Sequence, residues 1–149
     1  METRLEALEP KDRLVLFQLP PNFLKDQARL DAFIQMLPNT RRYAFEFRHR
    51  SWYHDEILSI LQKRNIALCI SDHEDAPSPW DATARHVYVR GHGPGGRYQG
   101  SYSGKTLARW AEAIAKWRRQ RREVFVYFDN DQKAAAPKDA QHLIRLVHG

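Results

Sequence analysis

Hydrophobic and polar residues alternate strictly in the segment 43–49, Tyr-Ala-Phe-Glu-Phe-Arg-His. This period of two predicts a β-strand whose aromatic residues share one face, with Ala44, Glu46 and Arg48 on the other. Charged groups that face the interior of a sheet are costly unless they are paired or used. The pattern therefore predicts a strand that lines a polar cavity.

Four further apolar runs predict strands at 14–19, 66–72, 86–91 and 123–129. Apolar residues spaced three and four apart predict helices around 27–37, 55–61, 107–117 and 138–147. Asp26 is the expected N-cap of the first helix. A loop with Pro77, Pro79 and Trp80 replaces the helix after the third strand, and a glycine-rich loop at 94–104 precedes the third helix.

Strands that alternate with helices predict an α/β fold with a parallel sheet and right-handed crossovers. In such folds functional groups gather at the carboxyl ends of the strands. Eight polar residues of this chain are expected there: Gln18, Glu46, Arg48, Asp72, Arg90, His92, Asp129 and Asn130. The third strand is ambiguous, since Cys69 and Ser71 share one face whereas Leu68, Ile70 and Asp72 share the other. Asp72 falls at the end of that strand, where alternation no longer decides.

Several ordered motifs resemble the domain-of-unknown-function 72 (YecE-like) family. They are the segments 16–21, 46–52, 88–93, 98–102 and 127–130, with Ala136-Pro137 and Asp139-Ala140 as a closing match. The resemblance runs from about residue 14 to the end of the chain. Gly91 departs from it, because the family pattern has an aliphatic residue between the Arg and the His.

The resemblance implies a (βα) barrel related to TIM barrels, without a settled activity. Family members usually carry further βα units before the strand at Leu14, whereas here only a polar lead, residues 1–13, precedes it. We therefore expect a single domain, 1–149, whose residues 14–149 form an incomplete barrel of about five parallel βα units. Five strands cannot close the usual eight-stranded barrel. Self-association into a homo-oligomer or a separate N-terminal segment would cover the open edges; the alternative is an open sheet that stands alone.

Composition narrows the class of protein. The chain has 149 residues, of which 42% are hydrophobic and 28% charged, as in one globular domain. One cysteine, Cys69, fits a reducing compartment, and neither a secretory signal nor a membrane-spanning run is visible, so we expect a cytoplasmic protein. The net charge of +6 favours an anionic partner such as a small anionic ligand or nucleic acid. The basic cluster at 118–122 is better explained as a solvated helix end.

Glu46, Asp129 and Asp72 form a candidate carboxylate set. With His92 they could hold a divalent cation, or they could divide into general acid and base, with Glu46, Asp129 and His92 as the catalytic group. The alternative is charge pairing with Arg48 and Arg90 inside a polar lumen. No HxH or HExxH spacing is present, so no metal ligands are assigned and the cofactor is left open.

The glycine-rich loop has the composition of an anion cradle, with a helix N-terminus near Ser103. Arg48, Arg90, Arg97, Gln18 and Asn130 are the expected ligand-binding residues. A flexible crossover loop is the alternative reading of the same glycines. Two tryptophans, Trp52 and Trp80, follow strand ends and would either stack on a sugar or base or cap the hydrophobic layer.

These features together favour an enzyme that acts on a phosphorylated or nucleic-acid-related substrate. A hydrolytic reaction at a phosphoester, with or without a metal ion, fits the arginine and carboxylate set best. Two alternatives stay open: a non-catalytic binding module for an anionic ligand or RNA, and a barrel fragment that is inactive without further units.

Overall fold

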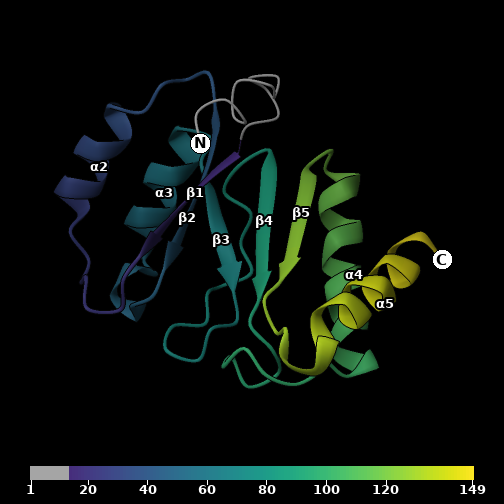
Figure 1. Cartoon of the computed structure of the whole chain (residues 1–149). Helices are drawn as coiled ribbons and strands as arrows, with labels where there is room; N and C mark the ends of the chain where they lie inside the picture. Colours follow the sequence, from purple (N-terminus) through teal and green to yellow (C-terminus); the bar gives the residue numbers. More distant parts are fainter. Residues whose placement is uncertain (1–13) are drawn as a thin grey trace, which may run out of the picture.

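The computed structural model describes residues 14–149, so the polar lead 1–13 lies outside the described residues. Five strands form one sheet, in which each pairs in parallel with the next in the order β1-β2-β3-β4-β5 (Figure 1). The strands are β1 (Leu14–Leu19), β2 (Arg42–Phe47), β3 (Ala67–Ser71), β4 (His86–Gly91) and β5 (Glu123–Phe128). The predicted α/β fold with a parallel sheet is confirmed.

Within residues 14–149, four α-helices alternate with the strands: α2 (Gln27–Gln35), α3 (Asp55–Lys63), α4 (Gly104–Arg119) and α5 (Ala135–His148). Short 3₁₀ turns lie at η2 (Arg50–Trp52) and η3 (Gln132–Ala134). A loop joins β3 to β4, as the prolines predict. Asp26 caps α2, because its carboxylate accepts a hydrogen bond from the Arg29 amide at 3.0 Å. In the described part of the chain no helix is long and apolar enough to cross a membrane.

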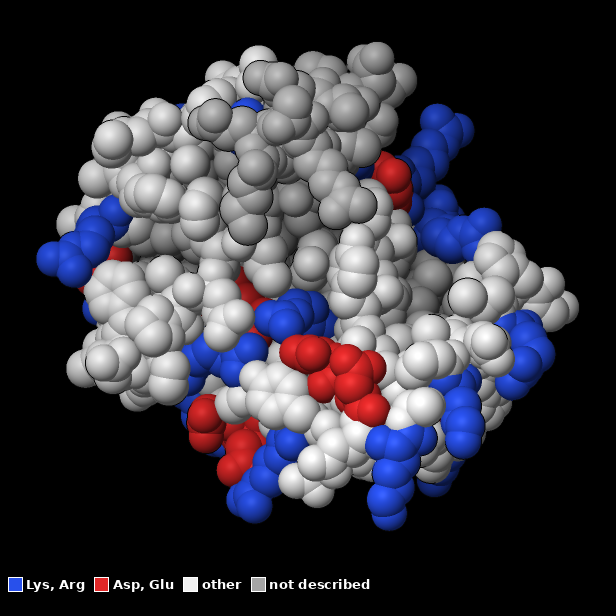
Figure 2. All heavy atoms as spheres, in the orientation of Figure 1, with Lys and Arg blue, Asp and Glu red and all other residues white. Residues whose placement is uncertain are grey.

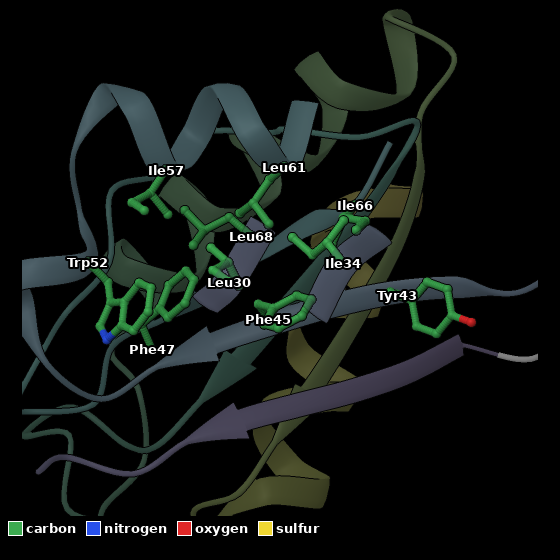
Figure 3. Packing of buried hydrophobic residues seen from close by; sticks show 10 residues of the cluster. All are labelled: Leu30, Ile34, Tyr43, Phe45, Phe47, Trp52, Ile57, Leu61, Ile66 and Leu68. Atoms are coloured by element: carbon green, nitrogen blue, oxygen red, sulfur yellow. The ribbon is translucent and has the colours of Figure 1, made fainter. Parts of the chain in front are cut away.

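All four helices cover one face of the sheet, and the apolar face of β2 is packed against α2 and α3 (Figure 3). Phe45 and Phe47 are buried among residues of these helices, including Ile34 and Leu61. The Trp52 ring stacks on Phe47 with centroids 4.8 Å apart and an interplanar angle of 8°. Of the two alternatives for Trp52, the structure therefore has the hydrophobic cap.

A second apolar cluster joins β4 and β5 to α4 and α5. Trp110 and Trp117 of α4 pack there, and Trp80 stacks on Trp117 with ring centroids 5.9 Å apart. Gly91 faces this cluster: a Cβ atom on it would lie 2.8 Å from the Trp110 ring and 3.1 Å from the Phe128 ring. The large indole therefore occupies the space that an aliphatic side chain at position 91 would fill.

The face of the sheet opposite the described helices is concave. Gln18 of β1 hydrogen bonds with Arg90 of β4, and Arg42 of β2 pairs with Glu123 of β5. Two strands lie between the members of each pair. A flat sheet would therefore keep the strands of each pair about 14 Å apart, at a strand spacing near 4.8 Å. The sheet therefore curls as in a TIM-barrel-like fold, and the polar residues of the strands face its hollow.

Candidate functional site

Arg90 lies at the centre of the polar cluster. Its Nη1 donates to Glu46 Oε2 at 2.6 Å and to Gln18 Oε1 at 3.4 Å, and its Nη2 donates to Asp129 Oδ2 at 2.8 Å. Residues of β1, β2 and β4 and the end of β5 thus meet at one guanidinium. Only alternation along each strand is needed to turn these side chains to the same face, which is why the sequence pattern predicts them together.

Glu46 and Arg48 are the buried half of this network. The Glu46 side chain is fully buried and accepts from Arg48 Nε as well as from Arg90. Arg48 donates a further hydrogen bond to the Tyr98 hydroxyl at 3.0 Å. Two guanidinium groups therefore face one buried carboxylate, and Asp129, whose side chain is 39% exposed, supplies the second negative charge.

Burial also sets the protonation of the groups around Glu46. Desolvation opposes charge on Arg90, but the ion pairs with Glu46 and Asp129 outweigh it and raise the pKa of Arg90. Burial, followed by the negative charge of Glu46, raises the pKa of the Cys69 thiol well above its ordinary value. Cys69 Sγ lies 3.8 Å from Glu46 Oε2, so Cys69 is a protonated donor on the polar face of β3 and not a thiolate nucleophile.

His92 follows β4 and is fully buried, and two carboxylates face its ring: Asp72 Oδ1 lies 3.3 Å from Nδ1 and Glu46 Oε1 lies 3.7 Å from Nε2. Its Nε2 lies 3.3 Å from Arg48 Nη2, and its Nδ1 lies 3.3 Å from Ser71 Oγ. A guanidinium nitrogen can only donate, so Nε2 is the acceptor in the contact with Arg48. His92 therefore supports Arg48, and its Nε2 lone pair is already used.

Asp72 does not join Glu46 and Asp129. Its Oδ1 accepts from the His92 amide at 2.7 Å, and its Oδ2 accepts from the Tyr102 hydroxyl. The same hydroxyl accepts from the Gly93 amide at 2.8 Å. Asp72 thus holds the start of the glycine-rich loop. The even-numbered residues of β3 face the helix side, as Leu68 does, and Asp72 continues this alternation.

The glycine-rich loop is closed on itself. The Gly96 amide donates to Gly93 O at 2.8 Å, and the Tyr98 amide donates to His92 O at 2.5 Å. Gly93 and Gly96 have φ values of +95° and +70°, and a Cβ on Gly93 would lie 2.2 Å from the Gln99 carbonyl oxygen. The glycines are thus required for tight packing, and these two amides are used inside the loop instead of facing an anion.

Two of the predicted ligand-binding residues lie outside the cluster. Arg97 is exposed and pairs with Glu74, so the structure does not bring it to Arg90. Asn130 is buried, and its Nδ2 donates to Gly100 O at 2.7 Å and to Asp139 Oδ2 at 2.8 Å. Asn130 therefore ties the end of β5 to the loop and to α5.

A metal centre finds no support in the described part of the chain. Among these residues no group of three or more His, Cys, Asp or Glu side chains is arranged to hold a metal ion. Both Glu46 oxygens pair with guanidinium groups, and Asp129 Oδ2 pairs with Arg90.

Three aromatic contributors were not assigned to the site from the sequence. Tyr98 accepts a hydrogen bond from Arg48 and has a φ of +64°, an uncommon conformation for a bulky residue. Tyr88 and Tyr127 stack with ring centroids 5.1 Å apart on the concave face beside Arg90. Tyr88 and Tyr127 alternate in phase with Arg90 and Asp129 along their strands, which turns them to that face, but their mutual contact needs the pairing of β4 with β5.

Positive and negative side chains adjoin in the middle of the face that Figure 2 presents, over the carboxyl ends of the strands. The opposing charges of the network nearly balance, with Arg48 and Arg90 against Glu46 and Asp129. The arrangement can hold an anion in exchange for the partly exposed carboxylate of Asp129.

Comparisons with solved structures show the same fold. A DUF72 family protein from Thermotoga maritima superposes with a TM-score of 0.82 at 24% identity, covering 92% of this chain and 58% of its own. A DUF72 family protein from Enterococcus faecalis gives a TM-score of 0.80 at 21% identity, covering 91% and 58%. The chain thus spans less than two thirds of the length of either protein.

No curated protein matches the sequence. The family model described as "Protein of unknown function DUF72" matches residues 1–149. The chain therefore belongs to the DUF72 family.

Proposed function

We propose that the Arg90 cluster binds a phosphorylated or nucleic-acid-related ligand and hydrolyses a phosphoester bond in it. The observation that carries the proposal is the position of Arg90, a guanidinium held by Glu46 and Asp129 and 18% exposed toward the hollow of the sheet. A planar, preoriented guanidinium is the protein group best matched to a phosphate.

The two carboxylates have different tasks in this proposal. Glu46 is fully buried, so it positions both arginines. Asp129 is partly exposed beside Arg90, so it is the candidate general base. A water molecule attacks phosphorus and gives its proton to Asp129, while the ester oxygen leaves and takes a proton from solvent. Arg90 stabilises the charge that develops on the phosphoryl oxygens, and the products are a phosphate and an alcohol.

A second candidate, a non-catalytic binding module for an anionic ligand, is favoured by a separate observation. Every charged group of the cluster already has an opposite charge as its partner, which is the normal state of buried ion pairs. In such a module the anion replaces Asp129 as the partner of Arg90, and no proton transfer is needed.

Binding is tested first, by isothermal titration of inorganic phosphate. Arg90→Gln should weaken binding at least about tenfold, since it removes a charged hydrogen-bond donor. Arg90→Lys keeps the charge and serves if the Gln variant is unstable. Arg85→Gln is the matched control, because Arg85 is exposed at the opposite end of the same strand. Equal phosphate affinity in the Arg90 and Arg85 variants would contradict the proposed site, as would a wild-type chain that binds no phosphate.

Catalysis is tested with 4-nitrophenyl phosphate and bis(4-nitrophenyl) phosphate. Asp129→Asn should lower kcat about 10²- to 10⁴-fold, the usual contribution of a general base. Its affinity for inorganic phosphate should be retained or increased, because the competing carboxylate is gone. Phosphate binding without hydrolysis of either ester would favour the binding module and reject the hydrolase.

A further inference from the structure

The concave face carries an aromatic surface that the phosphate proposal does not use. Tyr88 and Tyr127 stack with ring centroids 5.1 Å apart and an interplanar angle of 29°. Tyr88 is half-buried, since it packs against the cluster of Ala44, Ala67 and Ala84. Tyr127 is 50% exposed, so one side of its ring is held by Tyr88 and the remainder faces solvent.

This exposed ring lies next to the anion-binding group. Arg90 and Tyr127 are direct register partners on β4 and β5, so their Cα atoms are about 5 Å apart and their side chains share the concave face. Gln18 reaches Arg90 from the opposite side of the hollow. A phosphate on Arg90 would therefore have an aromatic platform on one side and an amide side chain on the other.

Trp52 and Trp80, the tryptophans that follow strand ends, cannot supply this aromatic platform. Trp52 is 1% exposed beneath the helices, and Trp80 stacks on Trp117 on the helix side of the sheet. Tyr98 is 37% exposed, but it lies in the glycine-rich loop with its hydroxyl held by Arg48, whereas Tyr127 is 50% exposed and is the register partner of Arg90.

We propose that Tyr127, supported by Tyr88, stacks on the base of a nucleotide whose phosphate is held by Arg90. The inference rests on the proposed function and deepens it by naming the ligand class, a nucleoside monophosphate unit. Aromatic side chains stack on any base, because every base has a π-face. The net charge of +6 agrees with such an anionic ligand. The unit can come from a free nucleotide or from a single strand.

Three ligands, each titrated calorimetrically, test base stacking on Tyr127 and the source of the nucleotide unit. They are adenosine monophosphate, ribose 5-phosphate and octaadenylate. The wild type should bind adenosine monophosphate at least about fivefold more tightly than ribose 5-phosphate, the lower end of stacking contributions. Tyr127→Leu should abolish this difference and leave ribose 5-phosphate affinity unchanged. Phe33→Leu is the control, since Phe33 is 39% exposed but lies on α2, which covers the helix side. Circular dichroism verifies that both variants are folded.

Each result of these titrations supports or rejects one part of the proposal. Equal affinity of the wild type for adenosine monophosphate and ribose 5-phosphate overturns the base platform but leaves the phosphate site standing. A preference for the base that survives in Tyr127→Leu also overturns it, because the base is then recognised elsewhere. Tighter binding of octaadenylate than of the mononucleotide assigns the site to single strands, and the reverse assigns it to free nucleotides. Failure of all three probes to bind rejects the phosphate site itself.

Discussion

Replacing Glu46 by Gln is the sharpest test of the charge network. Glu46 is fully buried and is the shared acceptor of Arg48 and Arg90. Gln keeps the shape and one acceptor oxygen but removes the charge, so Arg48, which is 5% exposed, loses its counter-ion. Breaking a buried ion pair from one side costs about 3–5 kcal/mol, because an uncompensated charge is left in a poorly solvated place.

The expected loss is a large part of a typical unfolding free energy of about 5–15 kcal/mol. With a urea m-value of about 2 kcal/mol/M, the midpoint of unfolding should fall by roughly 1.5–2.5 M. Urea titration followed by far-ultraviolet circular dichroism at pH 7 measures this shift. The double variant Glu46→Gln/Arg48→Gln should be more stable than Glu46→Gln alone, because the buried cation is removed with its partner.

Glu123→Gln is the matched control. Glu123 also pairs with an arginine, Arg42, but its side chain is 62% exposed, so the change should cost about 0–1 kcal/mol. If Glu46→Gln and Glu123→Gln shift the midpoint equally, burial does not govern the network, and the placement of Arg48 and Arg90 against a buried carboxylate is wrong.

Two further predictions concern the sheet. Gly91→Val should destabilise by about 1–3 kcal/mol, because its side chain would overlap the Trp110 ring, whereas Gly95→Ala, with open space around it, should not; urea midpoints that agree for both would refute the close packing. Burial lowers the pKa of His86, whose Nε2 donates to Tyr43 O at 2.9 Å. The folded state therefore favours neutral His86, and its contribution is full above the unfolded pKa near 6.5 and is lost as pH falls through the lower folded pKa. Stability should thus drop between pH 7.5 and 5.5 by up to about 1.4 kcal/mol per pH unit for this proton, and His86→Gln should remove that part of the drop.

Local periodicity was enough for the strands, the helices and, except in the ambiguous third strand, the face that each strand residue occupies. The period of two in β2 placed Glu46 and Arg48 on the polar face, and the same reasoning placed Arg90 and Asp129 there. These assignments succeed because side-chain direction along a strand is set by the backbone of that strand alone. The N-cap at Asp26 is local for the same reason.

The sequence did not predict which side chains pair with one another in the folded chain. Arg97 had the right chemistry for the site but pairs with Glu74, and Asp72 serves the loop through Tyr102. Asn130 likewise faces Asp139 instead of the hollow. Each partner lies nine or more residues away along the chain and is met only when strands, loop and α5 pack, so no period in the sequence encodes it.

The sequence by itself therefore determined the parallel α/β order, the polar face and the residue types of the proposed anion site. The tertiary structure alone decided that Arg90 is the residue at which four strands' side chains meet, that Trp52 belongs to the core, and that Tyr127 is left open beside Arg90. The physical reason is the curl of the sheet, which brings side chains from strands three positions apart into contact across the hollow.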